Sequence, residues 1–193
     1  MTTSQGDASS ENRPQLLLET VAAEIEAFVG QSGWDRPPTL FALVPTRLLA
    51  ADPAARPLLD PAIGDDPSAI SPEALTPVAQ DDLPDAPLDE ALAQIGWPDE
   101  VVGCALAHEI VMLPPAAEPE LDALGPAEAV SAAAEHPQRR EARLVMAVLR
   151  DGQSAGVLRL RAAADQPGTA DDLLTGPDLA PNLVTALAAT LAG

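Results

Sequence analysis

The chain has 193 residues, which is enough for one domain with a buried core, and 47% of them are apolar. Its 30 acidic residues against 10 basic ones give a formal net charge of -20, so we expect neither nucleic acid nor a membrane surface as a partner. The one cysteine, Cys104, excludes an intramolecular disulfide and a multi-cysteine zinc site.

Residues 1–12 are polar and carry no periodicity, so we predict a disordered tail before a single domain over residues 13–193. This end of the chain lacks the pattern of a secretory signal peptide. No apolar run approaches the roughly 20 residues that a membrane span needs. We therefore expect a cytoplasmic protein.

The first predicted element is an amphipathic helix over about residues 14–30. Its apolar side chains recur at helical spacing, at Leu17, Leu18, Val21, Ile25, Phe28 and Val29. Residues 39–44 are then typical of a short buried strand between prolines, and Thr46 is a candidate cap for a short helix after it.

Residues 52–87 are rich in proline and aspartate and break every periodic run. The segment is either a solvated linker or an arm packed on the body by its scattered apolar residues. A structureless loop of this length is uncommon inside a compact domain, so we favour a packed arm with one or two short helical turns.

Beyond the arm, the pattern predicts a short helix over 88–95, a long strand over 101–113 that is covered on both faces, and a helix over 127–135. A helix remains an alternative for 101–113 because alanine and leucine are frequent there. The last helix is predicted over about 179–191, with Asp178 as a candidate cap.

Two strands, 143–149 and 156–161, flank the hairpin signal Asp151-Gly152. A two-residue turn would mix polar and apolar residues on each face. A three-residue loop over 151–153 pairs Met146 with Leu158 and puts one set of side chains together on the other face, namely Arg143, Val145, Arg159 and Arg161. We therefore predict the longer loop. The element order indicates an α+β domain with a mainly antiparallel sheet of about four strands and helices packed on it.

A short echo surrounds the only two tryptophans, because Gln31-Ser-Gly-Trp34 recurs as Gln94-Ile-Gly-Trp97. Each copy follows a predicted helix and precedes a predicted strand. Gly33 and Gly96 fit as helix-ending glycines, and Trp34 and Trp97 are expected to lie over the helix–strand junctions. We interpret these four residues as structural corners.

The candidate catalytic residues are sparse. If 101–113 is a strand, Cys104 and His108 lie on one face but roughly 13 Å apart, too far for a shared metal ion, and only a helix would bring them together. Glu109 follows His108 on the opposite face, and His136 fits the end of a helix. The aspartate pairs at 65–66, 81–82 and 171–172 have no calcium-loop pattern. We predict no catalytic residues, no metal site and no cofactor.

Six of the ten arginines gather in and before the hairpin, at positions 139, 140, 143, 150, 159 and 161. Two interpretations are open. The arginines neutralise acidic residues of the same chain, such as those of the arm, or they form a positive patch for an external carboxylate or phosphate. Arg143, Arg159, Arg161 and His108 are therefore the candidate residues for a ligand or partner.

Residues 33–44 (GWDRPPTLFALV) and 96–106 (GWPDEVVGCAL), with the hairpin over 143–161, resemble a family of small acidic actinobacterial proteins of unknown function. The resemblance spans roughly residues 14–192. Its motifs describe a fold, so it implies no site residues, and it agrees with a cytoplasmic location.

Our leading functional hypothesis is a non-enzymatic binding or adaptor module that contacts another protein, because the patterned core comes without a catalytic constellation. The alternative is a small enzyme or sensor that binds an anionic ligand at the hairpin arginines near His108. The sequence leaves the oligomeric state open.

Overall fold

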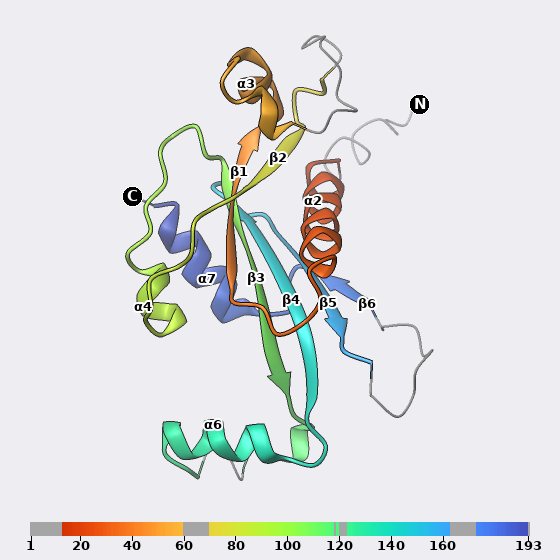
Figure 1. Ribbon diagram of the computed structural model, residues 1–193, viewed down its shortest axis with the longest axis vertical. Helices are drawn as coiled ribbons and strands as arrows, with labels where there is room; N and C mark the ends of the chain where they lie inside the picture. The colour runs from red at the N-terminus through yellow and green to blue at the C-terminus, as the bar shows by residue number, and fades with distance from the viewer. Residues whose placement is uncertain (1–12, 60–69, 118, 120–122, 163–172, 193) are drawn as a thin grey trace, which may run out of the picture.

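The computed structural model describes residues 13–59, 70–117, 119, 123–162 and 173–192. The elements, in chain order, are α2 (Arg13–Gly30), β1 (Thr39–Pro45), α3 (Thr46–Ala51), the 3-10 helix η1 (Arg56–Leu58), β2 (Leu75–Ala79), α4 (Leu88–Leu92), β3 (Gly103–Met112), the 3-10 helix η4 (Pro115–Ala117), α6 (Pro126–Glu135), β4 (Arg140–Leu149), β5 (Ser154–Leu160), β6 (Leu173–Gly176) and α7 (Pro181–Thr190). The strands form one antiparallel sheet in the order β2-β1-β3-β4-β5-β6 (Figure 1). The α+β class is thus confirmed, but with six strands where about four were predicted.

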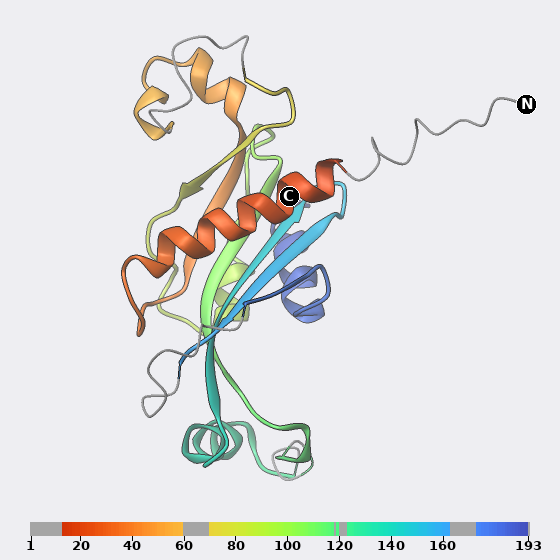
Figure 2. The same cartoon turned by 90° about the vertical axis from the view of Figure 1, so that its right-hand side faces the viewer.

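Helices cover the two faces of the sheet. α2 packs on one face, across β4 and β5, and α7 packs with α4 on the other (Figure 2). Alternate residues of β3 serve the two layers: Cys104 and Leu106 face α7, while Ala105 and Ala107 face α2. The long central strand predicted over 101–113 is therefore confirmed, and it is covered on both faces over its first half.

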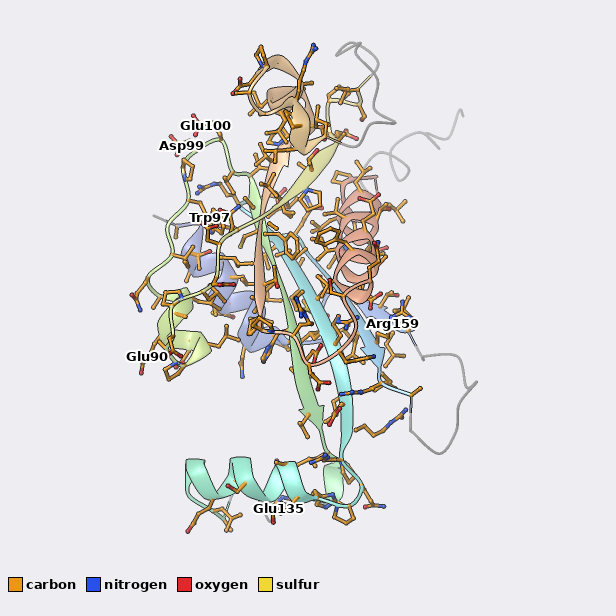
Figure 3. The ribbon with its side chains drawn as sticks, viewed as in Figure 1. Glu90, Trp97, Asp99, Glu100, Glu135 and Arg159 are labelled. Carbon is orange, nitrogen blue, oxygen red and sulfur yellow. The ribbon has the colours of Figure 1, made fainter. Side chains whose placement is uncertain are left out.

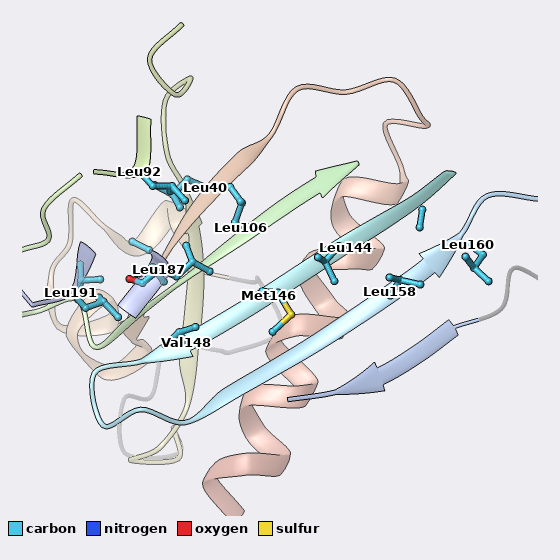
Figure 4. Packing of buried hydrophobic residues seen from close by; sticks show 14 residues of the cluster. Leu40, Leu92, Leu106, Leu144, Met146, Val148, Leu158, Leu160, Leu187 and Leu191 are labelled. Atoms are coloured by element: carbon cyan, nitrogen blue, oxygen red, sulfur yellow. Dashed lines mark hydrogen bonds between the residues drawn. The ribbon is translucent and has the colours of Figure 1, made fainter. Parts of the chain in front are cut away.

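The two layers differ in the size of their side chains. The α7 side holds the larger ones, including Leu106, Leu144, Met146 and Leu187 (Figure 4). The α2 side of the sheet is rich in alanine, at Ala105, Ala107, Ala147 and Ala155. Small residues on the sheet leave room for the larger side chains of α2, namely Leu18, Val21, Ile25 and Val29, which fill this layer.

The predicted helices are present, with two corrections at their starts. Thr46 does not cap α3, because Pro45 holds the N-cap position and the Thr46 hydroxyl shares a 3.0 Å hydrogen bond with Thr76. Asp178 does not cap α7, which begins at Pro181 after Ala180. In α7 the first helical position is held by Pro181, because the fixed backbone angle of proline suits a helix start.

The two additional strands are the edges of the sheet. β2 lies in the arm over 52–87, where only helical turns were predicted, and it pairs with β1. Pro77 lowers the strand signal, but a strand at a sheet edge tolerates proline because one side of its backbone needs no partner. The helical turn η1 also lies in the arm. β6 is the opposite edge and follows residues 163–172, which are outside the described part of the chain.

The β4–β5 hairpin has a three-residue loop, as predicted, but shifted by one position. The loop comprises Arg150, Asp151 and Gly152, closed by a 2.9 Å hydrogen bond from the Leu149 amide to the Gln153 carbonyl. Gly152 takes the loop's last position with φ 91°, which glycine adopts at little cost. Leu144 therefore pairs with Leu158, and Met146, which was predicted opposite Leu158, pairs with Gly156. The shift moves the register by two residues, so the predicted faces are kept.

The far half of the β3–β4 pair extends beyond the body of the sheet. β1 pairs with β3 only over residues 103–107, whereas β4 pairs with β3 along all ten residues. α6 lies at the distal end of this extension, away from α2 and α7 (Figures 1 and 2).

Three sequence predictions fall outside the described residues: the tail over 1–12, the middle of the arm over 60–69, and the aspartate pairs at 65–66 and 171–172. Among the helices that are described, none has both the length and the apolar character needed to cross a bilayer.

Candidate functional site

The arginines of the hairpin surround a buried carboxylate of α2. Glu26 is only 2% exposed, and its two oxygens accept hydrogen bonds from Arg159 Nε and Nη2 at 2.7 Å each. Arg143, also 2% exposed, lies 3.4 Å from the same carboxylate through Nη1. Two guanidinium groups thus share one buried anion.

The local fold explains this meeting. Glu26 belongs to the stripe of α2 that faces the sheet, together with Leu18, Ala22 and Ile25. Arg143 and Arg159 are direct cross-strand partners in β4 and β5, and the pleat turns both toward α2. Like charges placed opposite one another destabilise a sheet, so the carboxylate between them offsets their repulsion.

The corner after α2 completes the cluster. Gly33 has φ 81° and turns the chain back over the sheet, and its carbonyl accepts a hydrogen bond from Arg143 Nη2. The guanidinium carbons of Arg143 and Arg161 lie 4.5 Å and 5.3 Å from the Trp34 ring centroid, within cation–π range. The predicted corner at Gly33 and Trp34 is therefore present, and Trp34 also contacts two arginines.

Arg161 holds the outer part of the cluster. Its guanidinium donates to both carboxylate oxygens of Asp35, at 3.1 Å and 3.2 Å, and to Glu141 at 2.6 Å. The hydrogen bond with Asp35 raises the pKa of Arg161, so the group stays charged. Glu109 binds the Asp35 amide at 2.8 Å and lies 3.5 Å from Arg143. We define the arginine cluster as Arg143, Arg159 and Arg161.

The sheet separates His108 from the arginine cluster. His108 pairs with Leu144 on the α7 side, whereas its neighbour Glu109 pairs with Arg143 on the α2 side. Burial lowers the pKa of His108, against the opposing effect of Glu109, so the imidazole is neutral at pH 7. Its Nδ1 is buried and, like Arg143 Nε, has no hydrogen-bond partner in the described part of the chain.

Cys104 is an interior residue of the α7 layer. Its sulfur lies 3.7 Å from the Leu187 carbonyl and 3.6 Å from the Thr190 hydroxyl. Burial raises the pKa of the thiol to about 11, so it is protonated and a poor nucleophile at neutral pH. The described residues contain no group of three His, Cys, Asp or Glu side chains that would hold a metal ion.

An open cleft of about 310 Å³ lies between two loops on the other side of the molecule. One wall comes from the loop after β2, with Gln80, Asp81, Asp82 and Leu83, and the other from the segment after α4, with Gln94, Ile95, Gly96, Trp97 and Pro98; Leu40 of β1 also contributes. Both aspartates are exposed, and neither has an ion pair among the described residues. We call this the Trp97 cleft.

The wall that carries Trp97 is held from behind. Its indole Nε1 donates a 2.9 Å hydrogen bond to the Thr190 hydroxyl of α7. Arg150 donates to the carbonyls of Trp97 and Pro98 at 3.2 Å and 3.1 Å, and also to the carbonyls of Val101 and Leu191. α7 and the hairpin loop therefore fix the position of Trp97 in the wall of the cleft.

A family model described as PPA1309-like protein matches residues 18–192. The chain belongs to the PPA1309-like family. This family has no assigned function, so membership adds no site residues. The match confirms one part of the predicted resemblance, namely that the chain belongs to a family of unknown function. Neither the curated proteins nor the solved structures give a match.

For this PPA1309-like protein, the sequence grouped the hairpin arginines but did not identify the acidic residues that they bind. Glu26 was hidden in the apolar stripe of α2, and an acidic residue at a stripe position was the signal that would have found it. Gly96 is a correction: it lies four residues beyond the end of α4 and does not have the positive φ of Gly33, so it does not end the helix. The cleft was missed because its walls come from separate loops.

Proposed function

We propose that this protein is a non-enzymatic binding module of the cytoplasm, and that it recognises a basic segment of a partner protein. The proposed surface is the β2–β3 connection, residues 80–102. It contains the exposed acidic residues Asp81, Asp82, Asp85, Asp89, Glu90, Asp99 and Glu100.

The observation that carries the proposal is the unequal pairing of charge. The arginine cluster is occupied by Glu26, Glu109, Asp35 and Glu141 of the same chain. By contrast, the chain has no lysine or arginine at all between Arg56 and Arg139. The acidic β2–β3 connection lies across the sheet from the arginine cluster: Glu90, Asp99 and Glu100 appear on the side of α4, and Arg159 on the other (Figure 3). Arg150 is the nearby cation, and it donates to backbone carbonyls of this connection, while the seven carboxylates have no ion pair with another described residue. Such an acidic surface attracts a basic partner and speeds its association.

The alternative, an enzyme or sensor for an anionic ligand at the arginine cluster, has less support. An anion there would have to displace Glu26, whose carboxylate is buried and bound by two arginines. His108, which this alternative places beside the ligand, is on the opposite face of the sheet. The protonated thiol of Cys104 supplies no nucleophile.

The test is affinity purification from the native host with cross-linking, followed by direct binding of the purified partner. The surface variant is Glu90→Gln/Asp99→Asn/Glu100→Gln. The matched control, Glu24→Gln/Glu73→Gln/Glu135→Gln, removes the same charge from exposed positions on α2, before β2 and on α6.

We expect a partner that binds the wild type and the control, binds the surface variant more weakly, and dissociates as salt is raised. A partner that binds all three proteins equally, or no reproducible partner at all, would contradict the proposal.

A further inference from the structure

We propose that the Trp97 cleft is an anchor site for an arginine side chain of the basic segment. The inference rests on the proposed function and narrows it to one cleft and one side chain. Its basis is the set of residues around one cavity of about 310 Å³, which includes the half-buried Trp97, two half-buried aliphatic residues and two exposed aspartates.

Each part of the lining suits a different part of arginine. Leu83 and Ile95, which are half-buried, offer apolar surface to the methylene stem. The indole of Trp97 attracts a cation over its ring, and a planar guanidinium stacks better on it than an ammonium does. Asp81 and Asp82 provide carboxylates, which bind a guanidinium through paired hydrogen bonds.

The protein already uses the same combination internally. In the arginine cluster, Trp34 lies against Arg143 and Arg161, and Asp35 binds Arg161 through both of its oxygens. In the Trp97 cleft the tryptophan and the aspartates are present, and the described residues place no arginine side chain among its lining. An arginine from outside would complete the same set of contacts.

The cleft is suited to an anchor because its wall is held in place. Thr190 fixes the indole nitrogen, and Arg150 fixes the backbone of Trp97 and Pro98. A site held by neighbouring elements loses less entropy when a ligand binds. Arg150 itself is engaged with backbone carbonyls behind this wall and is not part of the lining.

The test uses protein labelled with 5-fluorotryptophan, whose two ¹⁹F signals report Trp34 and Trp97 separately. The probe is N-acetyl-arginine amide, and the matched control is N-acetyl-citrulline amide, which has the same shape without the charge. We expect a saturable shift of the Trp97 signal with arginine, a weaker one with N-acetyl-lysine amide, none with citrulline, and no movement of the Trp34 signal.

Two variants locate the site. Asp81→Asn/Asp82→Asn is expected to weaken arginine binding about fivefold or more, as the loss of two exposed ion pairs predicts. Gly96→Leu is expected to reduce the shift strongly, because it adds a large side chain at a lining position. An added Cβ at Gly96 meets no atom within 4 Å, so we expect the variant to fold. Glu24→Gln/Glu135→Gln, with the same change in charge, should bind as the wild type does.

The inference is wrong if the Trp97 signal does not move, if citrulline moves it as far as arginine does, or if Gly96→Leu binds arginine as the wild type does. These results are distinct from failure of the proposed function. A partner that binds the Gly96→Leu protein as tightly as the wild type would contradict the anchor and leave the acidic surface in place. An arginine-dependent Trp97 shift without any cellular partner would do the reverse.

Discussion

Arg143 and Arg159 face each other across β4 and β5, and the buried carboxylate of Glu26 binds both of them. The arginines of the hairpin therefore bind an acidic residue of the same chain. The two arginines join α2 to the middle of the sheet, and Arg143 also contacts Gly33 and Trp34 at the corner after the helix. The cluster therefore holds α2 and its exit loop against the sheet.

Removing the buried carboxylate is expected to be costly. Glu26→Gln leaves two arginines without their shared anion, and breaking a buried pair in this way costs about 3–5 kcal/mol of the free energy of unfolding. The measurement is urea denaturation followed by circular dichroism. Glu24→Gln, on the exposed side of the same helix, is the control and should change stability by less than about 0.5 kcal/mol. Equal effects of the two changes would contradict a structural role for the cluster.

The arginines are expected to contribute unequally. Arg143 is 2% exposed, whereas the Arg161 side chain is 34% exposed and its partner Asp35 is 77% exposed. Arg143→Ala should therefore destabilise the protein strongly, and Arg161→Ala by about 1 kcal/mol or less, because solvent screens exposed ion pairs. Urea denaturation in low and high salt measures both. A larger loss from Arg161→Ala than from Arg143→Ala would be inconsistent with this assignment.

Stability should depend on pH through His108. Burial lowers its pKa in the folded protein below the ordinary value of 6.5, so below pH 6.5 the unfolded chain binds the proton more readily than the folded one. Stability is then complete above pH 6.5 and falls as the pH drops toward the folded pKa. His108→Leu should flatten this part of the curve, which denaturation between pH 7 and 5.5 measures. An unchanged slope in the variant would show that other groups cause the dependence.

The thiol of Cys104 is expected to resist modification in the folded protein. The residue is fully buried and its pKa is raised to about 11, so both access and thiolate are missing. A thiol reagent such as iodoacetamide should react only through the unfolded state, and therefore slowly with the native protein and quickly in denaturant. Mass spectrometry over time measures both rates. Rapid labelling of the native protein at neutral pH would argue against the packing of α7 on β3.

The fold was predictable where one face of an element is strictly apolar. The stripe of α2 predicted a helix, and the alternation in the hairpin predicted which of its residues share a face. These faces survived a two-residue error in register because side chains alternate with a period of two. β2 was missed because Pro77 lowers its strand signal, and only the position of β2 at the sheet edge explains why that proline is tolerated.

The candidate site was less predictable because its contacts join distant parts of the chain. The arginines were found as a group, but Glu26 is separated from Arg143 by 117 positions and lies in a stripe that otherwise indicates core. The Trp97 cleft joins the loop after β2 to the segment after α4, and no local pattern connects Asp81 with Trp97. The two tryptophans that suggested corners have different surroundings. Trp34 lies against two arginines of the arginine cluster, whereas Trp97 lines a cleft together with two aspartates.

These two tryptophans allow one direct measurement of the central claim, that the arginine cluster is satisfied internally and the acidic cleft is the binding site. The ¹⁹F signals of 5-fluorotryptophan protein would be followed during titration with inorganic phosphate and, separately, with N-acetyl-arginine amide. We predict that phosphate leaves Trp34 unchanged and that arginine moves only Trp97. A saturable shift of Trp34 with phosphate, together with an unmoved Trp97, would contradict the account.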